Sequence, residues 1–351
     1  MRILIVGSDE VWSLERIYKK HLRELGIDVE LFPIQSYFYQ YYYSHVVNKI
    51  FYRLGVSSII QKLNDQLLQF AVNFKPELIW VFKGMEITPG TINKLKQLGV
   101  LVVNFNPDSP FIFSGKGSGN KNVVKSLPLY DLYLSYDRQI CNKIRNDFNL
   151  PSEILPFGYE LPDGLQNEFS ETKELVKMCF IGNADKYRIE FLKKVSSKIP
   201  IDVFGHGWDQ SVVGKNITVA APVYGNDFWK VLFKYRIQLN LMRPHNPNSH
   251  NMRSFEIPGV GGIGLYPDTP DHRSFFEEFG IVHLYTDVDD CISKAEKIFE
   301  WSPAQAREFR LRARALSIQN GYEYSSRTKQ FLSIVTEYSR ERRNLKTENK
   351  L

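Results

Sequence analysis

The segment from Asn248 to Leu265, NSHNMRSFEIPGVGGIGL, combines charged side chains with a glycine-rich backbone. Arg253 and Glu256 stand three residues apart, ahead of Gly261 and Gly262. A carboxylate accepts hydrogen bonds from sugar or ribose hydroxyls, while an arginine and backbone amides hold phosphate oxygens. The segment therefore indicates a site for a polyol that carries phosphate, such as a nucleotide sugar.

A second candidate phosphate site lies in FIGNADKYR, where an apolar strand runs into a helix. Gly182 and Asn183 follow the strand, and Lys186 and Arg188 open the helix. A small residue lets the backbone approach a ligand, and a helix N-terminus with two cations favours phosphate. The alternative is that both cations are solvated side chains at a helix start.

Two histidines extend these clusters. His206 lies between two glycines in FGHGW and is either a surface residue of a tight turn or a ligand contact. His250 belongs to the polar run LMRPHNPNSHNMRSFE, which also holds Arg243 and His245. So dense a polar cluster after a buried strand is hard to explain by packing, which favours a binding role. No second ligand stands at metal-site spacing from His206, so the sequence predicts no metal site.

In the first half of the chain, Asp108 follows the apolar strand predicted over residues 100–104. It either belongs to an ordinary Asp-Ser-Pro turn or faces a cleft, where it would orient or deprotonate an acceptor hydroxyl. Gly7, Ser8 and Asp9 form a strand-to-helix turn, but the full glycine fingerprint of a dinucleotide site is absent.

The elements that must position these residues alternate between strand and helix almost end to end. Short, continuously apolar strands separated by helices predict parallel sheets covered on both faces. The pattern occurs twice, so we expect two Rossmann-like domains, 1–160 and 161–325, joined within 155–173, and a closing segment, 326–351. Strands are predicted at 3–6, 29–32, 78–82, 100–104, 132–135, 177–181, 201–204, 237–241, 263–266 and 282–285. Helices at 303–319 and 325–343 close the chain, and the basic tail from 340 to 351 is predicted to fray.

Composition places few other limits on function. The 351 residues carry a net charge of +6, too weak to indicate nucleic acid binding but suited to an anionic small molecule or an anionic membrane surface. Three scattered cysteines suggest a reducing cytoplasm. No apolar run approaches the roughly 20 residues of a membrane span, and the N-terminal run is too short for a signal peptide. We therefore expect a cytoplasmic protein, soluble or peripheral at a membrane.

The aromatic-rich segment Tyr37–Tyr52, YFYQYYYSHVVNKIFY, allows two interpretations. It is either an aromatic helix packed within the first domain or a surface at a cleft or membrane interface, where tyrosine is favoured.

Several of these motifs resemble those of group 1 glycosyltransferases. The resemblance rests on the run Arg253–Ile257, the pair Gly261-Gly262 and the Asp287-x-Asp289 strand end. Within that group the chain is most similar to the CgeB-like subgroup, named for a spore-maturation protein.

A further segment, NGYEYSSRTKQFL, is similar to the closing helix of that subgroup, which usually reads His-Thr-Tyr-x-x-Arg. The likeness is firmest over residues 178–332 and is only architectural over the first domain.

The resemblance implies a GT-B fold, in which two Rossmann-like domains face each other and a final helix crosses back to the first. It implies a nucleotide-diphosphate sugar as co-substrate, held mainly by the second domain, with no cofactor and no obligatory metal. Glu256 would hold the ribose, Arg188 and Arg253 would face the diphosphate, and Gly261 and Gly262 would let it approach. The first Glu of the family's E-(seven residues)-E motif falls at Asn248, which leaves the donor sugar and the stereochemistry open.

The expected function is transfer of a sugar to an acceptor hydroxyl on a glycan, lipid-linked sugar, protein or small molecule. Two alternatives stay open: a non-catalytic nucleotide-binding or assembly protein of the same fold, and a sugar-nucleotide epimerase.

Overall fold

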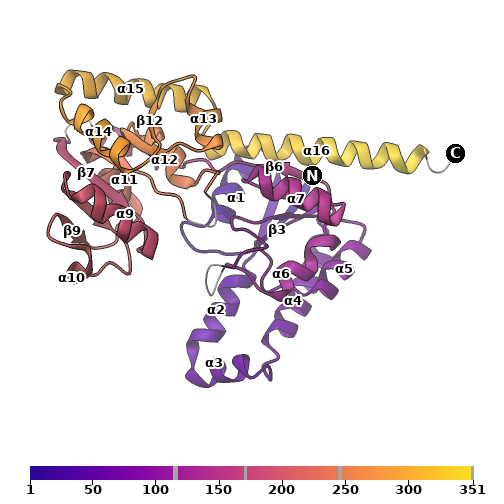
Figure 1. Cartoon of the computed structure of the whole chain (residues 1–351). Helices are drawn as coiled ribbons and strands as arrows, with labels where there is room; N and C mark the ends of the chain where they lie inside the picture. The colour runs from indigo at the N-terminus through magenta and orange to yellow at the C-terminus, as the bar shows by residue number, and fades with distance from the viewer. Residues whose placement is uncertain (114–117, 170–171, 244–246, 349–351) are drawn as a thin grey trace. The chain divides into compact units, whose positions relative to one another are not determined.

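The structure is a computed structural model that describes residues 1–113, 118–169, 172–243 and 247–348. The chain divides into two compact units (Figure 1). Unit 1 comprises Met1–Pro156 and the chain from Arg327 onwards, and unit 2 comprises Phe157–Ser326. The final helix, α16 (Tyr324–Glu348), thus belongs largely to unit 1, as the expected return of the chain to its first domain requires.

Within its described residues, unit 1 contains a six-stranded parallel sheet of order β2-β1-β3-β4-β5-β6. Its central strands β3 and β4 are apolar apart from Asn104 because helices cover both faces, and every residue of both strands is buried. The strands are β1 (Arg2–Val6), β2 (Asp28–Phe32), β3 (Leu78–Phe82), β4 (Leu101–Phe105), β5 (Leu132–Ser135) and β6 (Ser152–Ile154). The helices are α1 (Leu14–Glu24), α2 (Ile34–Ser44), α3 (Val46–Arg53), α4 (Ile59–Phe74), α5 (Pro89–Gln97), α6 (Lys121–Ser126) with the 3-10 turn η1 (Leu127–Leu129), and α7 (Arg138–Phe148).

The second sheet, in the described part of unit 2, is also parallel and six-stranded, with the order β12-β11-β10-β7-β8-β9. Its strands are β7 (Leu175–Ile181), β8 (Ile201–Phe204), β9 (Ile217–Ala220), β10 (Tyr235–Leu239), β11 (Gly264–Pro267) and β12 (Val282–Tyr285). The helices are α8 (Leu165–Phe169), α9 (Lys186–Ser196), α10 (Gln210–Val213), α11 (Gly225–Lys234), α12 (Met252–Val260), α13 (Pro270–Phe276), α14 (Val288–Phe299) and α15 (Pro303–Gln319). Two doubly wound sheets confirm the predicted fold class.

The core of unit 1 is completed by α16. The ring of Phe331 stacks on the buried indole of Trp80 in β3, with centroids 3.6 Å apart and planes within 6°. Further along the helix, the Arg342 guanidinium lies 3.2 Å from the Asp131 carboxylate. The prediction that the tail frays from residue 340 is wrong for the described residues, since α16 continues to Glu348. The pairing of Arg342 with Asp131 holds this part of the helix on unit 1.

The aromatic segment forms two helices rather than one. The chain breaks at His45, whose extended backbone ends α2 and begins α3. The Asn48 side chain stabilises the break, because its amide donates to the Tyr41 carbonyl at 3.0 Å and so satisfies the last turn of α2.

Candidate functional site

The sheet of unit 2 reverses its winding between two neighbouring strands, β7 and β10. From β7 the chain moves outward through β8 and β9, then returns to β10 on the other side of β7 and moves outward again. Ligands of open α/β sheets bind beyond the carboxyl ends of the strands at such a switch point. The loops that follow β7 and β10 are therefore the first place to look for a site.

The loops after β7 and β8 are joined by hydrogen bonds. The Asn183 side-chain oxygen accepts from the His206 amide at 3.0 Å, and the Gly182 carbonyl accepts from the Trp208 indole at 2.9 Å. A Cβ on Gly205 would lie 2.2 Å from the Gly182 carbonyl oxygen, so this approach requires glycine. The His206 ring, exposed at the edge of the site, hydrogen-bonds the Tyr224 hydroxyl at 2.7 Å.

Arg188 ties the two sides of the switch point together. Asp185 caps α9, which Lys186 opens, and so fixes where the arginine projects. One terminal nitrogen of Arg188 donates to the Asn183 carbonyl at 2.9 Å, and the other donates to the Leu241 carbonyl, just after β10, at 3.1 Å. Burial lowers the pKa of Arg188 to about 10, so the side chain stays charged at neutral pH. Both Nη atoms thus donate to main-chain carbonyls and position the two loops, a role that could not be predicted from the sequence.

Arg253 and Glu256 lie in the first turns of α12 and form an ion pair. The Arg253 guanidinium lies over the Phe228 ring, 4.2 Å from its centroid, and its Nε has no hydrogen-bond partner among the described residues. Burial raises the pKa of the Glu256 carboxyl, while Arg253 opposes that rise. A buried carboxylate and an under-used guanidinium thus meet at the helix N-terminus, where an anion is favoured.

A hydrogen-bond network anchors this N-terminus to the sheet. Asn251 caps α12 in a capping box with Ser254, and its side chain also donates to Asn240 at 2.8 Å. The Ser254 hydroxyl lies 2.8 Å from Nε2 of the buried His272. Burial lowers the pKa of His272 to about 4, so the ring is neutral at physiological pH and serves as a fixed partner.

The remaining residues of the polar cluster do not lie together in the fold. His250 is buried among aromatic rings, where its Nδ1 lies 2.7 Å from Asp271 and its Nε2 accepts from the Phe157 amide at 3.4 Å. Asn248 is exposed on the preceding turn. Arg243 is exposed and lowers the pKa of Arg188 by its charge, whereas His245 lies outside the described residues.

Gly261 and Gly262 do not join the site, because they lie at the opposite end of α12. Gly261 ends the helix with a φ of +83°, and its carbonyl accepts from Arg310 of α15 at 3.2 Å. A Cβ on Gly262 would lie 2.9 Å from the Ile257 carbonyl. Both glycines therefore serve close packing between α12, α15 and the sheet.

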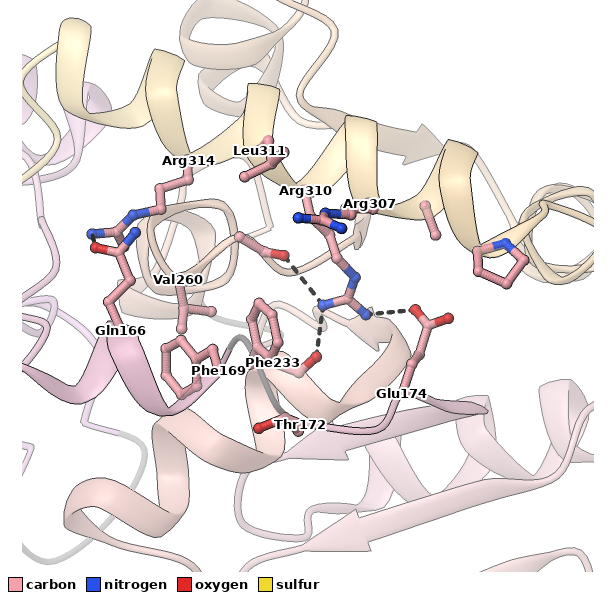
Figure 2. A pocket seen from close by; sticks show the side chains of 13 residues that line it. Gln166, Phe169, Thr172, Glu174, Phe233, Val260, Arg307, Arg310, Leu311 and Arg314 are labelled. Carbon is pink, nitrogen blue, oxygen red and sulfur yellow. Dashed lines mark hydrogen bonds and ion pairs between the residues drawn. The ribbon is translucent and has the colours of Figure 1, made fainter.

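A cavity of about 360 Å³ borders this end of α12. Figure 2 shows Arg310 descending from α15 to pair with Glu174, beside the aromatic rings of Phe169 and Phe233. Arg314, on the same helix, donates to the Gly259 carbonyl at 2.8 Å. Two arginines thus neutralise the carbonyl end of α12, where cations are favoured.

Unit 1 has its own switch point, between β1 and β3, and charged residues gather there. Lys83 follows β3, and its ammonium lies 2.7 Å from the Asp108 carboxylate. The Asp108 amide donates to the Asn106 side chain at 3.0 Å, which forms a turn at Asn106 rather than at Asp108. Two buried carboxyls, Glu15 and Glu86, interact electrostatically with Lys83. Burial raises the pKa of each to about 7.

Two comparisons with known proteins give matches. A family model described as "Glycosyl transferase-like" matches residues 188–333. The matched segment includes the switch-point side chains from Arg188 to Glu256 and runs into α16.

Solved structures similar to the chain include sugar-phosphate synthases and a putative UDP-N-acetylglucosamine 2-epimerase from Listeria monocytogenes. Sucrose-phosphate synthase from Thermosynechococcus elongatus has a TM-score of 0.66 at 11% identity, covering 96% of this chain and 98% of that one. An alpha,alpha-trehalose-phosphate synthase (UDP-forming) from Burkholderia vietnamiensis has a TM-score of 0.65 at 11% identity, covering 96% and 100%. A trehalose-6-phosphate structure from E. coli, bound with UDP-2-fluoro glucose, has a TM-score of 0.61 at 12% identity, covering 95% and 98%. These likenesses establish the GT-B fold. No curated protein matches the sequence.

Some residues at the two switch points were not singled out from the sequence. Glu15 lies far along the chain from Lys83 and Glu86, and no motif links the three residues. Tyr224 precedes α11 and meets His206 only in the fold. No group of three or more His, Cys, Asp or Glu side chains in the described ranges is arranged to hold a metal ion. None of the described helices is both long and apolar enough to span a bilayer.

Proposed function

We propose that the protein is a glycosyltransferase that moves a sugar from a nucleotide-diphosphate sugar to an acceptor hydroxyl without a metal. The observation that carries the proposal is the Arg253–Glu256 pair at the N-terminus of α12, beside a switch point within the segment that matches the glycosyl transferase-like family model. We also infer membership of the CgeB-like subgroup, from the run around Arg253 and the closing segment that begins at Asn320.

The proposed donor contacts follow from the chemistry of each group. Glu256 accepts hydrogen bonds from the ribose hydroxyls. Arg253 and Lys186, with the amides around Gly182 and Asn183, hold the diphosphate. Arg188 contributes positive charge. It also holds the loops after β7 and β10 together, because its terminal nitrogens donate to a carbonyl in each loop. His206 and Asn248, both exposed, border the donor, whereas His250, Gly261 and Gly262 support the site from within the fold.

Catalysis in this proposal is stabilisation of the departing diphosphate by preorganised cations and amides. The bond from the anomeric carbon to the diphosphate oxygen breaks, the bond to the acceptor oxygen forms, and the acceptor proton is taken up by a base. We assign the acceptor side to unit 1, where the Lys83–Asp108 pair orients the hydroxyl. Glu86 and Glu15 are nearby carboxyls with a pKa suited to proton transfer at neutral pH.

The first test is nucleotide binding by an isosteric variant. Glu256→Gln keeps the shape of the side chain but removes its charge, so we expect affinity for the cognate nucleoside diphosphate to fall by about tenfold or more. Isothermal titration with UDP, GDP and TDP measures the change. Glu190→Ala, which removes an exposed carboxylate from α9 in the same unit, is the matched control and should bind like the wild type.

Unchanged affinity in Glu256→Gln would exclude the ribose contact. Release of nucleoside diphosphate from a panel of nucleotide sugars, with and without EDTA, then tests turnover and metal independence. Binding without release or transfer would favour the non-catalytic alternative, which the neutral, exposed Asn248 supports. Isomerisation of the donor with no acceptor present would identify an epimerase.

A further inference from the structure

Helix α3 reverses the usual arrangement of an amphipathic helix. It contains no buried residue, and its apolar side chains face solvent. Figure 1 shows α3 at the end of α2 and α4 that lies away from the sheet of unit 1. Five apolar residues on or just after this helix have exposures between 47% and 70%: Val46, Val47, Ile50, Phe51 and Leu54. We call these five residues the α3 stripe.

The spacing of the stripe places it on one face of the helix, because residues three and four apart are neighbours on a helix surface. The opposite face packs on α2 through Tyr52, whose ring lies 4.9 Å from Phe38 and 5.7 Å from Tyr42. A soluble helix normally turns its apolar face inward, so a contiguous exposed stripe marks an interaction surface.

The charged side chains on α2 and α3 themselves are all cationic. Between Glu30 and Asp65 the sequence contains no acidic residue, whereas Lys49 and Arg53 lie on α3 itself. The Lys49 ammonium lies 4.7 Å from the centroid of the exposed Tyr43 ring. Cations, tyrosines and exposed aliphatic residues therefore form one continuous surface on α2 and α3.

We propose that the α3 stripe inserts into the interface of a membrane that contains anionic lipid. Apolar side chains on a helix that lies in the membrane plane enter the acyl boundary, while lysine and arginine meet anionic headgroups. Tyrosines suit the headgroup level because one end of the ring is polar. A second copy of the chain is a poorer occupant, because α3 paired with α3 brings Lys49 and Arg53 against their own copies with no carboxylate between them.

The test is flotation of the full-length protein with vesicles of phosphatidylcholine alone or with phosphatidylglycerol. The wild type should float with the mixed vesicles. The double variant Ile50→Ser/Phe51→Ser should remain in the dense fraction, and Lys49→Ser/Arg53→Ser should bind about tenfold more weakly. The matched control is Leu311→Ser/Ile318→Ser, which removes two exposed apolar side chains from α15 and should float like the wild type.

The melting temperature shows whether a variant has lost binding because it is misfolded. Because no residue of α3 is fully buried, the α3 variants should melt within about 2 °C of the wild type. They should also keep their affinity for nucleoside diphosphate. The membrane proposal and the proposed donor site are therefore tested independently of each other. Equal flotation of all variants, or no flotation of the wild type, would overturn the proposal. So would equal binding to neutral vesicles, or a wild-type dimer in light scattering that becomes monomeric in Ile50→Ser/Phe51→Ser.

Discussion

Two glutamates of unit 1, Glu15 and Glu86, have carboxyl pKa values raised well above the ordinary value. Both lie buried at the switch point of unit 1, where desolvation disfavours their charged forms. The Glu15 carboxylate is partly compensated, because it accepts from the Ser8 amide at 2.7 Å. Glu86 has its own amide and the nearby Lys83 as compensation. Ionising either residue therefore costs folding free energy, and this cost makes stability depend on pH.

Glu86→Gln tests that cost. Burial raises the pKa of Glu86 from the ordinary 4.5 to about 7, which corresponds to about 3 kcal/mol. The folded state holds its proton more tightly than the unfolded state, so the contribution of Glu86 to stability is complete below pH 4.5 and is lost as pH rises through 7. We expect the variant to melt several degrees above the wild type at pH 8 and close to it at pH 4.5. Thermal melts across this range measure the gap.

The control is the same substitution at an exposed glutamate, whose charge is not desolvated. Glu10→Gln changes an exposed glutamate of the same unit and should leave the melting temperature unchanged at both pH values. A gap between Glu86→Gln and the wild type that does not vary with pH would contradict the role of ionisation.

At the scale of elements, α12 connects two parts of unit 2. Its N-terminus carries Arg253 and Glu256, and its C-terminus is held by Arg310 and Arg314 of α15. Gly261 allows this second contact, because its left-handed backbone ends the helix directly against α15.

Gly261→Ala should therefore destabilise the protein by about 1–3 kcal/mol, from both backbone strain and steric contact. The new Cβ would lie 3.2 Å from the Arg310 carbonyl oxygen. Gly280→Ala is the matched control, since Gly280 also has a positive φ but a Cβ added there would have nothing within 4 Å. Chemical denaturation should show a larger loss for Gly261→Ala. An equal loss of stability in both variants would mean that backbone strain alone causes the destabilisation.

Ten of the twelve strands in the described residues could be predicted from the sequence, because short apolar runs between helices have few other arrangements. The short edge strands β6 and β9 were not predicted, since an edge strand has a neighbour on one side only and needs no continuous apolar run. The two ends of α12 could not be told apart, since Arg253 and Gly261 are close in sequence but lie at opposite ends of a helix. The position of His250 was also unpredictable. Its burial depends on Asp271 and on the rings of Phe157 and Phe275 from other segments, whereas the sequence shows only a polar run.

At the scale of the whole molecule, unit 1 is built from both ends of the chain. The Phe331 ring covers Trp80, and Gln330 donates to the Ile154 carbonyl at 3.2 Å. The first half of the chain therefore cannot complete its core alone.

Phe331→Ala should cost about 3–5 kcal/mol, because it leaves a cavity over Trp80. The loss should be confined to unit 1, so hydrogen exchange should accelerate in β3 and α1 and stay unchanged in β10 and α15. Thr336→Ala, at an exposed position of the same helix, is the control and should exchange like the wild type. Faster exchange spread evenly over both units would contradict this assignment.

The return of α16 also sets an order of events during synthesis. Unit 2 is one continuous segment, so all of it is present once Ser326 has left the ribosome. Residues 1–156 emerge earlier, but the face of Trp80 that Phe331 covers stays open until α16 has been made. We therefore expect unit 2 to complete its core first, the reverse of the usual order in which the N-terminal domain folds first. The interval before α16 emerges is when the nascent protein most needs protection from aggregation.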